Sequence, residues 1–228
     1  MDNIITLKDI NKIYGTVVKT QVVFDVDLSI EKSSFCSIIG QSGSGKTTIL
    51  NIMGTLDIPT SGQVIIAGND TKNMNKNKLA DLRNSTIGFI FQSHYLLPEF
   101  TAIENVLMPQ YIQNQRVSKD SKERAEELLN LVGLWNVKDN MANNMSGGQQ
   151  QRTAIARALI NNPSIILADE PTGNLDSEST ENIYGILRSI NEKFKTTFVI
   201  ITHDKRIAEK TDRIIEIKDG SISSDIYK

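Results

Sequence analysis

Alternating apolar and polar positions near the N-terminus predict β-structure. Over residues 22–30 every second position is apolar, so these side chains would share one face of a strand. Short apolar runs at residues 35–39, 64–67 and 86–91 predict three further strands, and the first of them is followed by a glycine-rich loop and a predicted helix. The asparagine- and lysine-rich stretch 72–78 predicts an exposed loop that leads into a helix.

The middle of the chain has the spacing of helices. Residues 101–160 are mainly helical in pattern. Residues 146–160 predict a helix that Ser146 caps, with backbone N–H groups at an exposed N-terminus. Residues 120–132 predict another helix, and its apolar face comprises Ala125, Leu128, Leu129 and Val132.

Strands and helices alternate again after residue 160. Residues 165–168 and 197–202 predict buried strands on either side of a helix at 177–194. A last strand at 213–217 precedes a turn at Asp219 and Gly220. Such alternation is typical of a mostly parallel sheet that is covered by helices. We therefore expect an α/β fold with a mostly parallel sheet, an antiparallel N-terminal β part and an inserted helical subdomain.

Length and composition indicate one globular domain. The chain has 228 residues, enough for one sizeable core, and we expect that core to comprise residues 1–92 and 161–228, with the helical subdomain at about 93–160. The net charge of −2 does not favour nucleic acid as a partner, so local groups must bind any anion. Cys36, the only cysteine, lies in an apolar run and is expected to be a buried hydrophobe.

Targeting signals are not evident in the sequence. No apolar run approaches the roughly 20 residues that a membrane-spanning helix needs. The first ten residues carry Asp2 and Asp9 and have neither a basic start nor an apolar block, so they do not resemble a signal peptide. We therefore expect the protein to stay in the cytoplasm.

The glycine-rich loop after residue 39 matches the phosphate-binding pattern G-x-x-x-x-G-K-[ST]. Its glycines let the backbone wrap around phosphates, and the following helix N-terminus adds positive potential. Lys46 would reach the β- and γ-phosphates, and the Thr47 hydroxyl would hold Mg²⁺. A chance match in a glycine-rich turn is the alternative, but the strand–loop–helix context favours a P-loop NTPase core. The motif reads Gly40, Gln41, Ser42, Gly43, Ser44, Gly45, Lys46 and Thr47.

Two carboxylates follow the apolar run at residues 164–168. Ligands collect at the carboxyl ends of strands in such sheets. We expect Asp169 to serve Mg²⁺ and Glu170 to polarise the attacking water. The alternative interpretation is that both carboxylates are ordinary solvated charges. The P-loop elsewhere in the chain disfavours this alternative.

The segment Met145 to Gln149 resembles the Leu-Ser-Gly-Gly-Gln signature of ATP-binding cassette (ABC) ATPases. Methionine replaces the leucine, which conserves apolar volume and leaves Ser146 intact. Further family positions match in order along the chain. The resemblance implies that Tyr14 stacks on adenine, that Gln92 links the γ-phosphate to the helical insertion, that Asp176 communicates between two sites, and that His203 is the switch histidine.

The resemblance implies ATP and Mg²⁺ as cofactors. The expected catalytic residues are Glu170, His203, Gln92 and Lys46, and the expected metal ligands are Thr47, Gln92 and Asp169. The expected ATP-binding residues are Tyr14, Gly40, Gln41, Ser42, Gly43, Ser44, Gly45, Lys46, Thr47, Thr48, Gln92, Ser146, Gly147, Gly148, Gln149 and Asp176. Two other residues are expected to have no such role: His94 as an ordinary surface residue, and Trp135 as a core or edge packing residue.

The resemblance also implies partners. In the family, the signature caps a γ-phosphate held by the P-loop of a second cassette, so a head-to-tail dimer is expected, together with an integral-membrane permease. The ATPase would then be peripheral, at the cytoplasmic face of the cell membrane. A permease helix would dock near residues 92–104. Segments 92–109 and 171–177 resemble cassettes of macrolide exporters, lipoprotein-releasing systems and antimicrobial-peptide resistance.

Three alternatives stay open at this point. A regulatory cassette that drives a cell-division or wall-remodelling membrane partner would have the same catalytic residues. A soluble DNA-repair or chromosome-organising ATPase would carry a long coiled-coil insertion, and this chain has only a short one. A ribosome-acting protein would have two cassettes in one chain.

Overall fold

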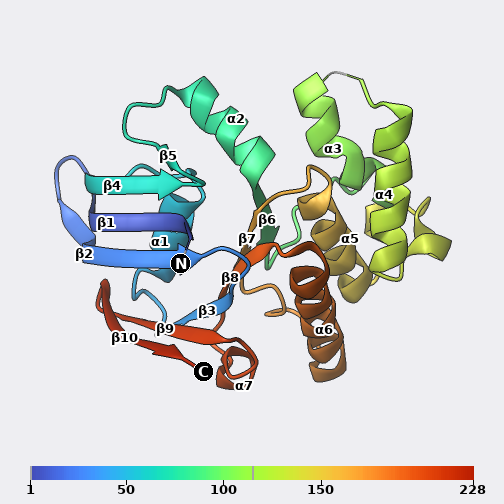
Figure 1. The fold of residues 1–228 in the computed structure, drawn as a ribbon. Helices are drawn as coiled ribbons and strands as arrows, with labels where there is room; N and C mark the ends of the chain where they lie inside the picture. Colours follow the sequence, from blue (N-terminus) through green and yellow to red (C-terminus); the bar gives the residue numbers. More distant parts are fainter. Residues whose placement is uncertain (1, 115) are drawn as a thin grey trace.

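Two β-sheets pack on either side of one short helix in the computed structural model, which describes residues 2–114 and 116–228 (Figure 1). The smaller sheet has the strand order β2-β1-β4-β5, and every neighbouring pair in it is antiparallel. Its strands are β1 (Asn3–Tyr14), β2 (Thr20–Glu31), β4 (Ser61–Ile66) and β5 (Asn69–Asp70).

The larger sheet has the strand order β10-β9-β3-β8-β7-β6. All of its neighbours are parallel except the β9–β10 pair. The predicted α/β class, with a mostly parallel sheet and an antiparallel N-terminal β part, is therefore confirmed. These strands are β3 (Phe35–Ile39), β6 (Ile87–Phe91), β7 (Ile165–Asp169), β8 (Thr197–Ile201), β9 (Arg213–Lys218) and β10 (Ser221–Tyr227).

The helices divide into two groups. Helix α1 lies between the sheets, whereas α3, α4 and α5 lie together on the side of the molecule away from the smaller sheet (Figure 1). None of the helices in the described ranges has the length and apolarity needed to cross a membrane. The helices are α1 (Lys46–Met53), α2 (Lys76–Thr86), α3 (Ala102–Asn114), α4 (Lys119–Leu131), α5 (Gly147–Leu159), α6 (Ser177–Phe194) and α7 (Lys205–Ala208), with short 3-10 turns at Trp135–Val137 and Ala142–Asn144.

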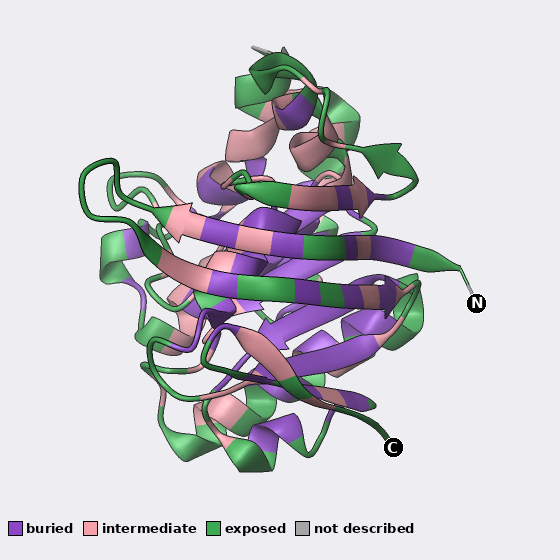
Figure 2. Ribbon diagram, turned by 90° about the vertical axis from the view of Figure 1, so that its left-hand side faces the viewer, coloured by how far each residue is buried: buried purple, intermediate pink, exposed green. Residues whose placement is uncertain are grey.

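Successive side chains of the central strands pack into two different hydrophobic cores, one on each face of the larger sheet. On β7, Ile165 and Leu167 pack toward α1 and the smaller sheet, while Ile166 and Ala168 pack toward the helical side. Because both faces are covered, the strand is apolar and buried along almost its whole length. Figure 2 shows buried residues, in purple, on the elements that lie behind the smaller sheet. The two cores hold the carboxyl end of this strand in place.

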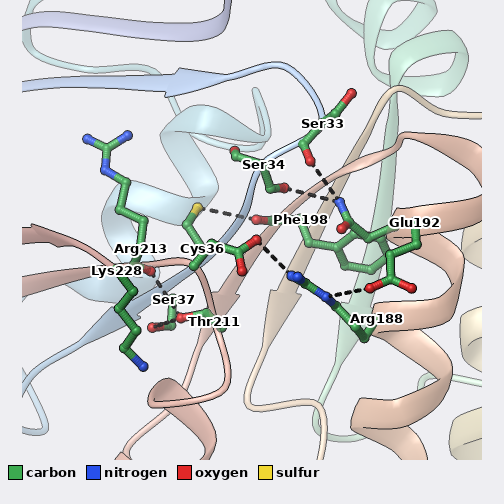
Figure 3. Close-up of polar contacts among 12 residues, drawn as sticks. Ser33, Ser34, Cys36, Ser37, Arg188, Glu192, Phe198, Thr211, Arg213 and Lys228 are labelled. Atoms are coloured by element: carbon green, nitrogen blue, oxygen red, sulfur yellow. Dashed lines mark hydrogen bonds and ion pairs between the residues drawn. The ribbon is translucent and has the colours of Figure 1, made fainter.

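Buried polar contacts fix β3 between its neighbours (Figure 3). The hydroxyls of Ser37 and Thr211 are 2.9 Å apart, and the Asn191 amide donates to the carbonyl of Ser33 at 3.0 Å. Cys36 is buried in the same strand, as expected, and burial raises the pKa of its thiol to about 12. Since β3 runs directly into the glycine-rich loop, these contacts also position that loop.

Several predictions of local structure differ from the fold. Thr86 ends helix α2 and does not begin the following strand. The stretch 72–78 is only partly a loop, because Asn75 caps α2 by accepting the Lys78 N–H at 2.9 Å. His94 is half-buried and has φ of 52°, so describing it as an ordinary surface residue was wrong. Trp135 lies at an edge, with the Lys138 Nζ 5.0 Å from its ring centre.

Candidate ATP site

The glycine-rich loop joins β3 to α1 along a path that only glycine allows at two positions. Gly40 has φ of 151°, and a Cβ there would lie 2.2 Å from the carbonyl oxygen of Ile217. Gly45, the N-cap of α1, has φ of 99°. Both values lie in the region that other residues rarely adopt. The loop therefore turns tightly, and the N-terminus of α1 faces its concave side.

Lys46 and Ser44 fill the inside of this loop. The Lys46 Nζ donates to the carbonyls of Gly40 at 2.9 Å and Gln41 at 2.7 Å, and its residue is only 9% exposed. Ser44 is 6% exposed, and within the described chain its hydroxyl has no hydrogen-bond partner. A buried hydroxyl without a partner costs free energy. The loop thus presents a lysine and an unsatisfied hydroxyl, which are groups that an oxyanion such as phosphate satisfies.

The register of the parallel sheet brings the remaining polar groups to the same edge. Ile201 pairs with Ile38 on one side and with Asp169 on the other, and Asp169 in turn pairs with Phe91. Consequently the segments that follow four adjacent strands begin at one level. They contain the P-loop, His203, Glu170 and Gln92, all of which had been predicted as site residues.

Asp169 and Thr47 meet across the site. The Thr47 hydroxyl donates to the Asp169 carboxylate at 3.3 Å. Burial raises the pKa of Asp169, and the hydrogen bond from Thr47 and the charge of Lys46 only partly oppose that shift. A carboxylate that burial makes costly to ionise gains from a nearby cation. The pair therefore fits the hydroxyl and carboxylate oxygens that Mg²⁺ prefers.

Glu170 and His203 form a second pair beside the first. The His203 Nδ1 lies 2.8 Å from the Glu170 Oε1, and the Glu170 backbone has φ of 46°. The Glu170 side chain is mostly buried, whereas the His203 side chain is largely exposed. Among the described residues, no hydrogen bond is made by the other imidazole nitrogen of His203, which is therefore available to a bound group. A carboxylate oriented by a histidine can accept a proton from water.

Gln92 is held by a residue that the sequence did not single out. Its amide donates to the Asn174 Oδ1 at 3.1 Å, and the Asn174 amide donates to the Gln92 carbonyl at 3.3 Å. A Cβ on Gly173 would lie 2.6 Å from the Gln92 Nε2, so a side chain there would displace the Gln92 amide from this position. Asp176 follows Asn174 by two residues and caps α6 by accepting the Ser179 N–H at 2.8 Å.

The signature residues lie apart from the loop. Ser146 caps α5 in a reciprocal capping box with Gln149, as the predicted capping residue should. In the described part of the chain no hydrogen bond joins residues 146–149 to residues 40–48. A Cβ on Gly148 would instead contact the Ser179 hydroxyl at 3.7 Å. The chain therefore presents two separate halves of the predicted site.

The ABC transporter family model matches residues 23–173, which is more than half of the chain. The chain belongs to the ABC transporter family. The resemblance drawn from the signature is thereby confirmed.

Curated ABC transporter proteins show the same relationship over nearly the full chain. The lipoprotein-releasing system ATP-binding protein LolD 1 of Rhodopseudomonas palustris is 47% identical over 225 residues, which cover 98% of this chain and 100% of that protein. LolD of Shewanella frigidimarina is 50% identical over 203 residues, which cover 89% and 84%.

Solved ABC structures have the same fold. The dimeric ATP-binding cassette MJ0796 in a post-hydrolysis state, bound to ADP and phosphate, has a TM-score of 0.89 and 41% identity, with 98% of each chain covered. The cassette cbiO1 of Clostridium perfringens has a TM-score of 0.88 and 25% identity, with 99% of this chain and 88% of that one covered. The chain is thus the ATP-binding and ATP-hydrolysing subunit of an ABC transporter.

The buried hydroxyl of Ser44 gives a direct test of the loop. We expect Ser44→Ala to leave the free energy of unfolding without nucleotide unchanged, or to raise it by up to about 1 kcal/mol, because a desolvation cost disappears. The same change should weaken ATP binding roughly 10-fold to 100-fold, because a hydrogen bond to a charged group is lost. Urea denaturation and calorimetric titration with ATP measure the two effects.

Ser37→Ala is the matched control. Its hydroxyl is equally buried but bonds Thr211, so this variant should lose about 1 kcal/mol of stability and keep its ATP affinity. The opposite pattern, with Ser44→Ala destabilised and normal in ATP binding, would contradict the assignment.

Proposed function

We propose that this ATPase powers a membrane permease that extracts lipoproteins from the membrane, and that it is held at the cytoplasmic face of that membrane through the permease. The edge at which the P-loop, Asp169, Glu170 and His203 gather carries the catalytic part of this proposal. The name of the relatives, lipoprotein-releasing system ATP-binding proteins at 47% and 50% identity, supports the substrate class.

The proposed binding site for ATP extends over the P-loop. The triphosphate would lie in the curl of residues 40–48, where Lys46, the Ser44 hydroxyl and the N-terminus of α1 supply hydrogen bonds and positive potential. Tyr14 would stack on the adenine ring. Mg²⁺ would be held by Thr47, Asp169 and Gln92, and when bound it supplies positive charge that neutralises the phosphates.

Glu170 is the proposed general base for hydrolysis. It would orient a water molecule and accept its proton while His203, which is positioned by its contact with Glu170, holds the γ-phosphate. Lys46 and the backbone N–H groups of the loop would stabilise the charge that develops on the phosphate oxygens. Electrostatic positioning dominates phosphoryl transfer, so small displacements of these groups should matter.

A second copy of the cassette is proposed to complete each site. Ser146 and Gly148 lie at the N-terminus of α5, which has no acidic residue in its first turn and suits an anion. In a head-to-tail dimer they would cap the γ-phosphate bound by the partner's P-loop. The dimeric MJ0796 structure supports association of two cassettes.

The proposed contact with the permease is a groove between α2, β6, α3 and α5. Its cavity measures about 570 Å³ and is lined by Leu56, Phe89, Phe91, Pro109, Ile112 and Arg157, among others. Its lining residues come from before and after the segment 92–104, where docking was expected, and none belongs to that segment. Its walls combine these apolar side chains with Asp81, Arg83 and Asn84, and such a mixed lining suits a short amphipathic helix.

Arg157 links this groove to the Gln92 segment. Its guanidinium donates to the carbonyls of His94 and Tyr95, each at 2.6 Å, and these two residues have φ of 52° and 48°. The Tyr95 ring packs edge-on against Phe91 at 5.3 Å. A permease helix that moves in the groove would therefore displace the loop that carries Gln92. The contacts of Arg157 with this loop would couple ATP hydrolysis to movement of the permease.

Replacing Glu170 tests the catalytic proposal. We expect Glu170→Gln to slow ATP turnover by about 10²–10⁴-fold, because the general base is lost, and to accumulate an ATP-bound dimer. Steady-state phosphate release and sedimentation with ATP measure both effects. Glu192→Gln, an exposed change at the far end of α6, is the control and should behave as wild type. Wild-type ATP turnover by Glu170→Gln would rule out Glu170 as the general base.

Replacing Ile112 tests the groove. This residue of α3 is highly exposed, and we expect Ile112→Glu to reduce the permease that co-purifies from gently solubilised membranes by about tenfold, because a charge enters an apolar contact. Ile226→Glu on β10 is a control of the same chemistry outside the groove. Recovery of a cell-division membrane protein instead of a permease would contradict the lipoprotein proposal.

A further inference from the structure

Lys12, Tyr14 and Asp57 form a closed polar cluster beside the P-loop helix. The Tyr14 hydroxyl donates to the Asp57 Oδ2 at 2.6 Å. The Lys12 Nζ donates to the Asp57 Oδ1 at 2.5 Å and to the carbonyl of Ile58 at 2.7 Å. Each oxygen of the carboxylate thus has its own donor, one from the lysine and one from the phenol.

The partners come from two elements that meet at this point. Lys12 and Tyr14 are two residues apart near the end of β1, so their side chains project on the same side of the strand. Asp57 lies in the loop that follows α1. The same loop is tied to β1 by the Thr60 N–H, which donates to the Asn11 carbonyl at 2.8 Å, and by the Ile13 N–H, which donates to the Thr60 hydroxyl at 2.9 Å.

Burial and charge make the cluster well defined. Lys12 is only 9% exposed, although it carries a charge. Burial alone would raise the pKa of Asp57, but the hydrogen bonds from Lys12, Tyr14 and the Ile58 N–H outweigh it and hold that pKa below its ordinary value. Burial and the bond to Asp57 raise the pKa of Tyr14, so its hydroxyl stays a donor.

The cluster leaves only part of the tyrosine ring available. The Lys12 Nζ lies over the Tyr14 ring, 4.7 Å from its centre, so one face of the ring is already covered by a cation. The residue as a whole is nevertheless 40% exposed. A flat aromatic group can therefore stack only on the opposite face, and the bond between Tyr14 and Asp57 fixes the orientation of that face.

We propose that Lys12 and Asp57 are positioning residues for adenine: they hold the Tyr14 ring in one orientation relative to α1 and direct the base to the face that Lys12 does not cover. This proposal rests on the adenine role proposed above for Tyr14. Helix α1 begins at the phosphate-binding Lys46 and leads within four residues of its end to Asp57. Helix α1 would thus help to position both the phosphates and the adenine base of the bound nucleotide.

A purely structural ion pair is the competing explanation, and nucleotide selectivity separates the two. A partly exposed ion pair contributes little to stability and would affect all ligands of the loop equally. A positioning pair affects only ligands that carry a base. Calorimetric titration with ATP and with inorganic triphosphate therefore distinguishes the two explanations.

We expect Lys12→Met and Asp57→Asn each to raise the Kd for ATP about threefold to tenfold, and to leave the Kd for inorganic triphosphate within about twofold, since stacking on a base is partly lost. Tyr14→Phe should act in the same direction, because it removes the hydroxyl that donates to Asp57. That variant keeps the ring and the charges, so it stays informative if the other two fold poorly. Tyr14→Ala should give the largest selective loss.

Lys32→Met and Asp2→Asn are the matched controls. Lys32 and Asp2 form an ion pair at 2.7 Å on another part of the surface, so both changes should leave the two ligands bound as in wild type. If Lys12→Met, Asp57→Asn and Tyr14→Phe bind ATP as wild type, or lose ATP and triphosphate equally, the positioning proposal is overturned. If Tyr14→Ala itself shows no selective loss of ATP, the adenine role of Tyr14 fails and the positioning proposal fails with it.

Discussion

The site depends on the register of four adjacent parallel strands. Because β6, β7, β8 and β3 are paired in step, the segments that leave their carboxyl ends start at one level. Those segments carry the proposed general base Glu170, together with His203, Gln92 and the phosphate loop. A shift of one strand by a single residue would turn its side chains to the opposite face and separate these groups. The two hydrophobic cores that cover the sheet maintain this register.

The sequence could predict that the residues proposed for catalysis gather at one sheet edge, because they belong to short local patterns. A strand that ends in a glycine-rich loop, or in two carboxylates, identifies its function without knowledge of its neighbours. Residues that hold a site residue from a distant segment could not be found in this way. Asn174 contacts Gln92 across 82 positions, and Asp57 contacts Tyr14 across 43. Only the folded chain brings such pairs together.

Element boundaries were less predictable for a related reason. Thr86 has the β-branched side chain that favours a strand, yet it ends α2, because tertiary contacts decide where a marginal residue belongs. His94 lacks any local pattern, and its position is fixed by Arg157 from α5, which binds its carbonyl. The packing of α5 against the Gln92 segment could not be read from either segment alone. The same packing connects the proposed permease groove to the ATP site.

We propose that each ATP site is shared between two copies of this chain, and mixing two inactive variants is the direct test of this arrangement. Lys46→Met disables the phosphate loop, and Ser146→Asp keeps a good helix cap but places a negative charge where the γ-phosphate of a partner would lie. In a head-to-tail dimer of one copy each, both lesions fall in one site and the other is intact. We expect the mixture to hydrolyse ATP although neither variant does so alone. A mixture as inactive as its components would contradict it.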